Sequence, residues 1–132
     1  KAHNHNWQGS RKETTVWDIQ NMAAMGGDKA QDEKTSHSTQ KPLECMARPM
    51  RNNSVEGDWV YDPFLGSGTT IIAAEQLARR CIGIELSAAY CDIIVNRWIK
   101  YRKKNNLSYN FTCNGEPRED HEESTRSCTT SP

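Results

Sequence analysis

The sequence lacks an excess of one charge, a paired-cysteine motif and a long hydrophobic run, and each absence excludes a class of protein. Its 17 Lys and Arg residues balance 17 Asp and Glu residues, so net charge gives no argument for a nucleic-acid partner, although a local patch can still bind one. The five cysteines include no C-x-x-C pair, so neither a disulfide framework nor a zinc site is indicated. No run approaches the roughly 18 apolar residues of a membrane span. The cytoplasm is therefore the simplest compartment, with no membrane partner.

The chain of 132 residues has room for one compact domain, followed by a polar tail. We place the domain boundary at residue 115, because residues 116–132 have almost nothing to bury and are expected to be disordered. Residues 22–38 are polar and show no sustained period, which predicts a long mobile loop inside the domain.

The first elements are predicted from alternation and from proline positions. Thr15, Trp17 and Ile19 alternate with Thr14, Val16 and Asp18, which is the period of a strand. Pro42 is suited to the first position of a helix, and Pro49 is expected to end or kink that helix. Three tryptophans are expected to pack in the core: Trp17, Trp59 and Trp98.

The centre of the chain alternates between strand and helix patterns. Short buried strands are predicted at residues 59–64 and 81–86, with a helix over residues 71–80 between them and another after Ser87. This order predicts an α/β fold in which the two strands are parallel neighbours joined by a right-handed crossover. The helix after Ser87 ends in a cluster of cations, which we interpret as a solvated helix end rather than a phosphate-binding patch: Arg97, Lys100, Arg102, Lys103 and Lys104.

A glycine loop at residues 66–68 separates the first of these strands from its helix, and two familiar ligands fit it poorly. A phosphate-binding P-loop requires lysine where Thr69 stands, which disfavours a nucleoside triphosphate. A dinucleotide fingerprint requires a third glycine where Ile71 stands, and the bulk of Ile71 would block close packing of helix on strand.

An acidic residue at the end of the second strand narrows the choice of ligand. Glu85 lies 17 positions after Gly68, where its carboxylate should face the loop and can accept both hydroxyls of a ribose. Loop and acid together indicate an adenosine. Because the glycines do not suit a pyrophosphate, the indicated adenosine is that of S-adenosyl-L-methionine, whose ammonium group Asp62 could meet.

Three ordered stretches resemble one family. "DPFLGSGTT", with "TQKP" before it and "IGIELSAAYCDIIVNRW" after it, resembles the amino-group DNA methyltransferases that modify adenine N6 or cytosine N4. In the permuted motif order of their beta class, T-Q-K-P precedes the glycine motif, as it does here. The resemblance runs from about Trp7 to Lys104 and implies a partial doubly wound, Rossmann-like methyltransferase fold. Residues 1–115 would then be the C-terminal, cofactor-binding portion of the domain, from a bacterial or phage-encoded protein.

The resemblance also implies which residues hold S-adenosyl-L-methionine. Glu85 would bind the ribose, while Thr39 and Lys41 would lie near the methionine carboxylate. Phe64 has two open interpretations, a core residue or a direct contact to the cofactor. The methionine and adenosine portions would be surrounded by Asp62, Phe64, Gly66, Ser67, Gly68 and Thr69.

The chemistry of this family also needs a loop that the chain does not contain. That loop reads Asp, Ser or Asn followed by Pro-Pro and an aromatic residue, and it binds the amine of a flipped-out base. No two prolines are adjacent in this chain, whose prolines are Pro42, Pro49, Pro63, Pro117 and Pro132. The permuted order places the loop upstream of residue 1. We therefore expect no catalytic residue and no metal ligand here, no activity of the chain alone, and DNA as a partner of the complete enzyme.

The missing N-terminal half would be supplied in cis or by a separate chain, and unpaired sheet edges would favour self-association. Two other classes stay open. A non-catalytic cofactor-binding or interaction module would bind S-adenosyl-L-methionine without methyl transfer. A different nucleotide-binding protein would instead bind a nicotinamide or triphosphate nucleotide.

Overall fold

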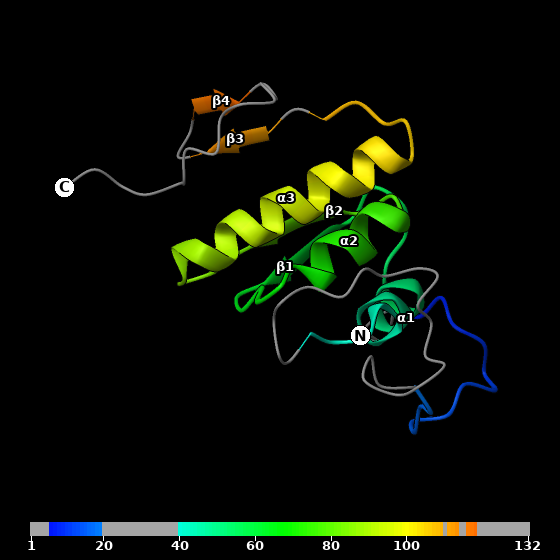
Figure 1. The fold of residues 1–132 in the computed structure, drawn as a ribbon. Helices are drawn as coiled ribbons and strands as arrows, with labels where there is room; N and C mark the ends of the chain where they lie inside the picture. Colours follow the sequence, from blue (N-terminus) through cyan, green and yellow to red (C-terminus); the bar gives the residue numbers. More distant parts are fainter. Residues whose placement is uncertain (1–5, 20–39, 110, 114–115, 119–132) are drawn as a thin grey trace, which may run out of the picture.

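The computed structural model describes residues 6–19, 40–109, 111–113 and 116–118 (Figure 1). The predicted loop at 22–38 and most of the predicted tail lie outside this part. Within it, no helix has the length and apolar character needed to cross a membrane. The elements are α1 (Leu43–Asn53), β1 (Trp59–Asp62), α2 (Thr69–Gln76), β2 (Arg80–Gly83), α3 (Ala88–Lys104), β3 (Phe111–Cys113) and β4 (Glu116–Arg118).

β1 and β2 are parallel neighbours connected through α2, so the predicted strand, loop, helix, strand and helix order is confirmed. Their register runs from Trp59 opposite Arg80 to Asp62 opposite Gly83. β1 is shorter than expected because Pro63 follows it, and proline has no N–H to donate to a strand ladder. Both strands therefore end at the same edge, and the residues after them form neighbouring loops.

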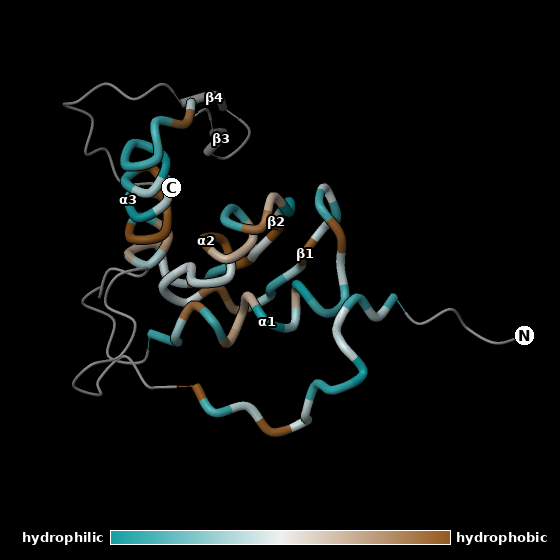
Figure 2. The backbone as a smooth tube through the Cα atoms, turned by 90° about the vertical axis from the view of Figure 1, so that its right-hand side faces the viewer, coloured by the Kyte–Doolittle hydropathy of each residue, from teal (hydrophilic) through white to brown (hydrophobic). Residues whose placement is uncertain are grey.

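The core lies on one face of this sheet, where Val60 and Cys81 pack against buried residues of the helices. α2 lies between α1 and α3 in both views (Figures 1 and 2). Trp98 of α3 packs against the same cluster, as expected from the sequence. The buried cluster consists of Leu43, Ala47, Met50, Ile72, Ala73 and Ala74.

The opposite face of the sheet carries exposed apolar side chains, which we call the outer face: Trp59, Tyr61, Ile82 and Ile84. Trp59 is 62% exposed, so its predicted place in the core is wrong. Since successive side chains of a strand point to opposite faces, burying Val60 turns Trp59 outward. The Arg80 guanidinium lies over the Trp59 ring, 5.4 Å from its centroid. A doubly wound sheet is covered on both faces, so this exposure fits part of such a domain.

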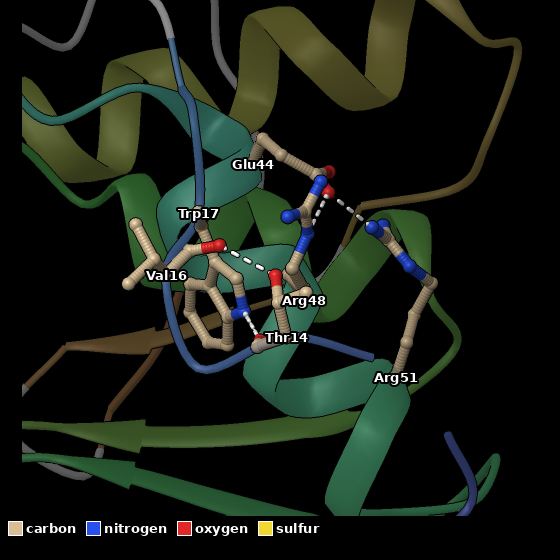
Figure 3. Close-up of polar contacts among 6 residues, drawn as sticks. All are labelled: Thr14, Val16, Trp17, Glu44, Arg48 and Arg51. Atoms are coloured by element: carbon tan, nitrogen blue, oxygen red, sulfur yellow. Dashed lines mark hydrogen bonds and ion pairs between the residues drawn. The ribbon is translucent and has the colours of Figure 1, made fainter. Parts of the chain in front are cut away.

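Residues 14–19 do not form the predicted strand. The Trp17 indole N–H donates to the Thr14 carbonyl at 3.0 Å, and the Thr14 hydroxyl donates to the Val16 carbonyl at 2.7 Å (Figure 3). These bonds between side chain and backbone close a local turn, which alternation of apolar residues does not reveal. Trp17 is 37% exposed and its ring lies 5.5 Å from Cζ of Arg48, so it rests on α1 rather than in the core.

Arg48 belongs to a charged group on α1 in which two guanidinium groups share one carboxylate. Arg48 Nε lies 2.9 Å and Arg51 Nη2 lies 2.5 Å from Glu44 Oε1 (Figure 3). The hydrogen bond from Arg51, together with that from Arg48, holds the pKa of Glu44 below its usual value. The pair Glu44 and Arg48 spans one helical turn, and the pair Glu44 and Arg51 spans the site of Pro49.

α1 does not end at Pro49 but continues to Asn53. The bond that proline cannot donate is offset by burial of Met50 in the following turn, and the Asn53 side chain donates to the Pro49 carbonyl at 2.9 Å. A second difference lies at Glu116–Arg118, which was expected to begin the disordered tail. This segment forms β4, antiparallel to β3, and a count of apolar residues does not reveal such backbone pairing.

Candidate functional site

The glycine loop needs glycine for two separate reasons. Gly66 and Gly68 have positive φ angles of 55° and 79°, a region that side chains disfavour. Gly68 also lies against α3, where an added Cβ would be only 3.1 Å from two side-chain carbons of Ile94. The loop can therefore turn sharply from β1 into α2 while α3 packs directly on it.

Asp62, at the end of β1, fixes both ends of this loop. Its Oδ1 accepts the Phe64 N–H at 2.9 Å, and its Oδ2 accepts the Thr70 hydroxyl at 2.5 Å. The carboxylate thus lies beside the first turn of α2, where the helix dipole favours negative charge. The Asp62 carboxylate therefore lies beside the loop, where we expect it, from the sequence, to meet the ammonium group of a ligand.

Glu85, after β2, reaches across to the loop after β1. Its Oε2 accepts the Gly66 N–H at 2.8 Å, and its Oε1 accepts the Ser87 N–H at 2.9 Å. These two bonds orient the carboxylate, which has about four acceptor positions in all. The same geometry opposes a phosphate at this end of the loop, because the Gly66 N–H already faces a carboxylate.

The segment before α1 also reaches the loop. The Thr69 hydroxyl donates to the Lys41 carbonyl at 3.3 Å, and the Lys41 side chain is exposed. Thr39 lies outside the described residues. The structure therefore brings Lys41, Asp62, residues 66–69 and Glu85 to one edge of the sheet, as the sequence predicts.

Phe64 is 85% exposed, which excludes the interpretation that it is a core residue of this chain. Its backbone is held by Asp62, so the ring lies at the start of the loop with its surface open. An exposed phenylalanine beside a polar loop offers a planar apolar surface for a ligand ring.

Arg97 was missed as a loop residue by the sequence analysis, and its assignment to a solvated helix end is wrong. Its Nη1 lies 2.8 Å from the Ser67 carbonyl oxygen and 3.2 Å from Thr69 Oγ1. Arg97 follows Ile94, which touches Gly68, by one helical turn, so the two side chains share the face of α3 that covers the loop. That spacing alone could not reveal it, because tertiary packing decides which face of α3 covers the loop.

Two cysteines near the site are unsuited to nucleophilic chemistry. Burial raises the pKa of the Cys81 thiol to about 11, with a further contribution from the negative charge of Asp62. Burial likewise raises the pKa of Cys91, whose thiol lies 3.7 Å from the Glu85 carbonyl oxygen. Both thiols are protonated at neutral pH, and the thiolate is the reactive form.

The comparisons with known proteins fit this arrangement of strands, loop and acid. The family model described as DNA methylase, of the N6/N4 type, matches residues 1–96. The chain belongs to the N6/N4 DNA methylase family. Membership confirms the resemblance carried by the T-Q-K-P, glycine-loop and I-G-I-E-L stretches.

Curated members of the N6/N4 DNA methylase family align with only part of their own length. The chain is 36% identical to the type II methyltransferase M.HinfI of Haemophilus influenzae over 66% of this chain and 24% of that protein. It is 44% identical to the type II methyltransferase M2.DpnII of Streptococcus pneumoniae, over 46% of this chain and 23% of that protein. The chain thus spans about a quarter of the length of the curated relatives it matches.

Solved structures are similar over a comparable portion. A crystal structure of the M1.HpyAVI–SAM complex is 42% identical, with a TM-score of 0.46, over 48% of this chain and 32% of that chain.

Two glycine substitutions separate backbone strain from steric contact in this methylase chain. Gly57 and Gly68 both have positive φ, but a Cβ on Gly57 would meet nothing within 4 Å. We expect Gly57→Ala to lower the free energy of unfolding by about 1 kcal/mol, and Gly68→Ala to lower it by more because Ile94 must also move. Urea unfolding followed by circular dichroism measures both.

The effect of Gly68→Ala should shrink in an Ile94→Ala background, where the colliding carbons are gone. Equal costs for the two glycine substitutions would contradict the close approach of α3 to the loop.

Proposed function

We propose that this chain is the S-adenosyl-L-methionine-binding part of a DNA methyltransferase that modifies the exocyclic amine of adenine (N6) or cytosine (N4). The main support is the Glu85 carboxylate, which is held against the glycine loop by the Gly66 N–H at 2.8 Å. In a parallel α/β sheet, ligands bind beyond the carboxyl ends of the strands, where these two groups meet. Family membership supplies the type of reaction.

The site residues suit the parts of this cofactor. Glu85 would accept the ribose hydroxyls, Asp62 would attract the ammonium group, and the exposed Phe64 ring would contact the apolar portion. Thr39 and Lys41 would lie near the carboxylate. When bound, the cofactor supplies an electrophilic methyl group on its sulfonium. The role of this chain is to bind and orient that donor, with Gly66, Ser67, Gly68 and Thr69 forming the wall of the site.

The chain would be inactive alone, because it has no Pro-Pro loop to bind the amine of a target base. The outer face supports a missing half as partner: Trp59, Tyr61, Ile82 and Ile84 are exposed there on a sheet whose type is ordinarily covered on both sides. The remaining portion of the domain, in cis or as a separate chain, would cover this face and supply the catalytic loop. In its absence, the outer face and the edges of β1 and β2, which are unpaired among the residues that the structure describes, would favour self-association.

A non-catalytic cofactor-binding module is the second candidate, and the absence of adjacent prolines favours it. It would share every feature of cofactor binding and differ only in methyl transfer. A triphosphate-binding protein is less well supported, because Glu85 already places negative charge on the Gly66 N–H.

Calorimetry with S-adenosylhomocysteine tests the site directly. We expect the unmodified chain to bind, and Glu85→Ala to weaken binding roughly tenfold to a hundredfold because charged hydrogen bonds to the ribose are lost. Gly66→Val should also abolish or weaken binding, since φ is positive there. Glu56→Ala, at an exposed turn before β1, is the matched control and should bind normally. Unchanged affinity in both site variants would contradict the assignment.

Complementation tests the proposed missing half. A segment carrying a Pro-Pro loop from upstream coding sequence, or from a neighbouring gene, should bind this chain and restore transfer of labelled methyl from S-adenosyl-L-methionine to DNA. Ile82→Asp on the outer face should weaken that association by burying a charge, measured by size-exclusion chromatography with light scattering. Arg11→Asp, at an exposed residue outside the sheet, controls for added negative charge. Association without methyl transfer would support the non-catalytic candidate instead.

A further inference from the structure

We infer that Arg97 is a positioning residue for the glycine loop: its guanidinium selects the orientation of the Ser67–Gly68 peptide group and thereby sets the affinity for cofactor. This inference rests on the proposed function, because the loop is the wall of the proposed cofactor site. Arg97 lies in α3, 30 residues after Ser67 in sequence, and its Nη1 lies 2.8 Å from the Ser67 carbonyl oxygen.

The same nitrogen lies close to two buried hydroxyl groups. Arg97 Nη1 is 3.2 Å from Thr69 Oγ1 and 3.4 Å from Ser67 Oγ, and these two oxygens are 3.5 Å apart. Ser67 is only 5% exposed and Thr69 only 4%. A buried carbonyl or hydroxyl that loses its partner is costly, so removing the guanidinium would favour a rearrangement of the loop.

The contacts around the Ser67–Gly68 peptide group show why the hydrogen bond from Arg97 to the Ser67 carbonyl matters. A peptide group is planar, so the Ser67 carbonyl and the Gly68 N–H point in opposite directions and move together. The carbonyl accepts from Arg97, and the N–H donates to the Leu65 carbonyl at 2.9 Å. Both ends of this peptide group are therefore hydrogen-bonded, one to α3 and one within the loop.

Because Gly68 does not itself fix the orientation of the peptide group before it, a contact from outside the loop is needed to do so. Gly68 tolerates both signs of φ, so rotation of the Ser67–Gly68 peptide group meets little steric resistance from Gly68 itself. The hydrogen bond from Arg97 selects the observed orientation among those that glycine allows. Ile94 supports this arrangement by packing on Gly68 one turn earlier in α3.

Arg97 and Glu85 thus hold the loop through different groups. Glu85 accepts from the Gly66 N–H at 2.8 Å, while Arg97 donates to the Ser67 carbonyl. If the Ser67–Gly68 peptide group rotated, the Gly68 N–H would leave the Leu65 carbonyl, and the turn that presents Gly66 to Glu85 would loosen. The ribose-binding acid depends on that turn, so Arg97 acts on the cofactor through the loop and not by contact.

The test compares Arg97→Ala, Arg97→Lys and Lys104→Ala in the full chain. Because one nitrogen makes these three contacts, lysine can keep the charge and the donor, whereas alanine removes both. Lys104 is an exposed cation at the end of the same helix and serves as the matched control. Two quantities are measured: the affinity for S-adenosylhomocysteine by calorimetry, and hydrogen exchange of the Gly66 and Gly68 amides by NMR without ligand.

We expect Arg97→Ala to weaken S-adenosylhomocysteine binding about tenfold and to accelerate exchange of both glycine amides, with only a small drop in melting temperature because the loop rearranges locally. Arg97→Lys should recover most of the affinity, and Lys104→Ala should match the unmodified chain. These results would support a positioning role. A general loss of stability would instead lower the melting temperature strongly.

Three outcomes would overturn the inference. Unchanged affinity in Arg97→Ala, with Glu85→Ala still impaired, would remove the role of Arg97 and leave the proposed function standing. Equal loss in Arg97→Ala and Arg97→Lys with a strongly lowered melting temperature would show a general folding role. No binding by the unmodified chain would overturn the proposed function and this inference with it.

Discussion

The hydrogen bond between the Glu85 carboxylate and the Gly66 N–H, 2.8 Å long, joins the two loops on which the rest of the site depends. It can form because β1 and β2 are parallel and end at the same edge, with Asp62 opposite Gly83. The bond places the acid against the glycine loop, two residues after the exposed Phe64. It also places negative charge where a phosphate-binding loop would need bare N–H groups, so it separates a nucleoside-binding site from a nucleotide-binding one.

Packing of the helices on one side of the sheet stabilises the edge at which β1 and β2 end. The helices partly bury Val60 and Cys81 on the face opposite the outer face, and α3 approaches the glycine loop through Ile94 and Arg97. The outer face carries exposed Trp59 and other apolar side chains. The sheet is thus covered on one face and exposed on the other. This agrees with the length of the chain, which spans about a quarter of the curated relatives it matches, 24% in the case of M.HinfI.

Local patterns predicted the centre of the molecule well and its periphery poorly. The order of strands and helices, and the meeting of Asp62, Gly66 and Glu85, follow from hydrophobic runs, glycine positions and the rule that parallel strands end at one edge. The strand expected at residues 14–19 failed because Trp17 and Thr14 bond to nearby backbone instead. The register of a strand decides which face is buried, and a short apolar run such as residues 59–62 does not reveal it, so the exposure of Trp59 could not be foreseen. The place of Arg97 depends on how α3 packs, which is a tertiary property.

The central claim is that the Asp62, glycine-loop and Glu85 edge holds the adenosine and methionine portions of S-adenosyl-L-methionine. A crystal structure of this chain with S-adenosylhomocysteine tests it most directly. We expect the ribose hydroxyls within hydrogen-bond distance of the Glu85 carboxylate, with the Gly66 N–H bond retained and the Phe64 ring against the ligand. Ligand bound elsewhere on the chain, with Glu85 and the glycine loop making no contact to it, would show that this edge is not the cofactor site.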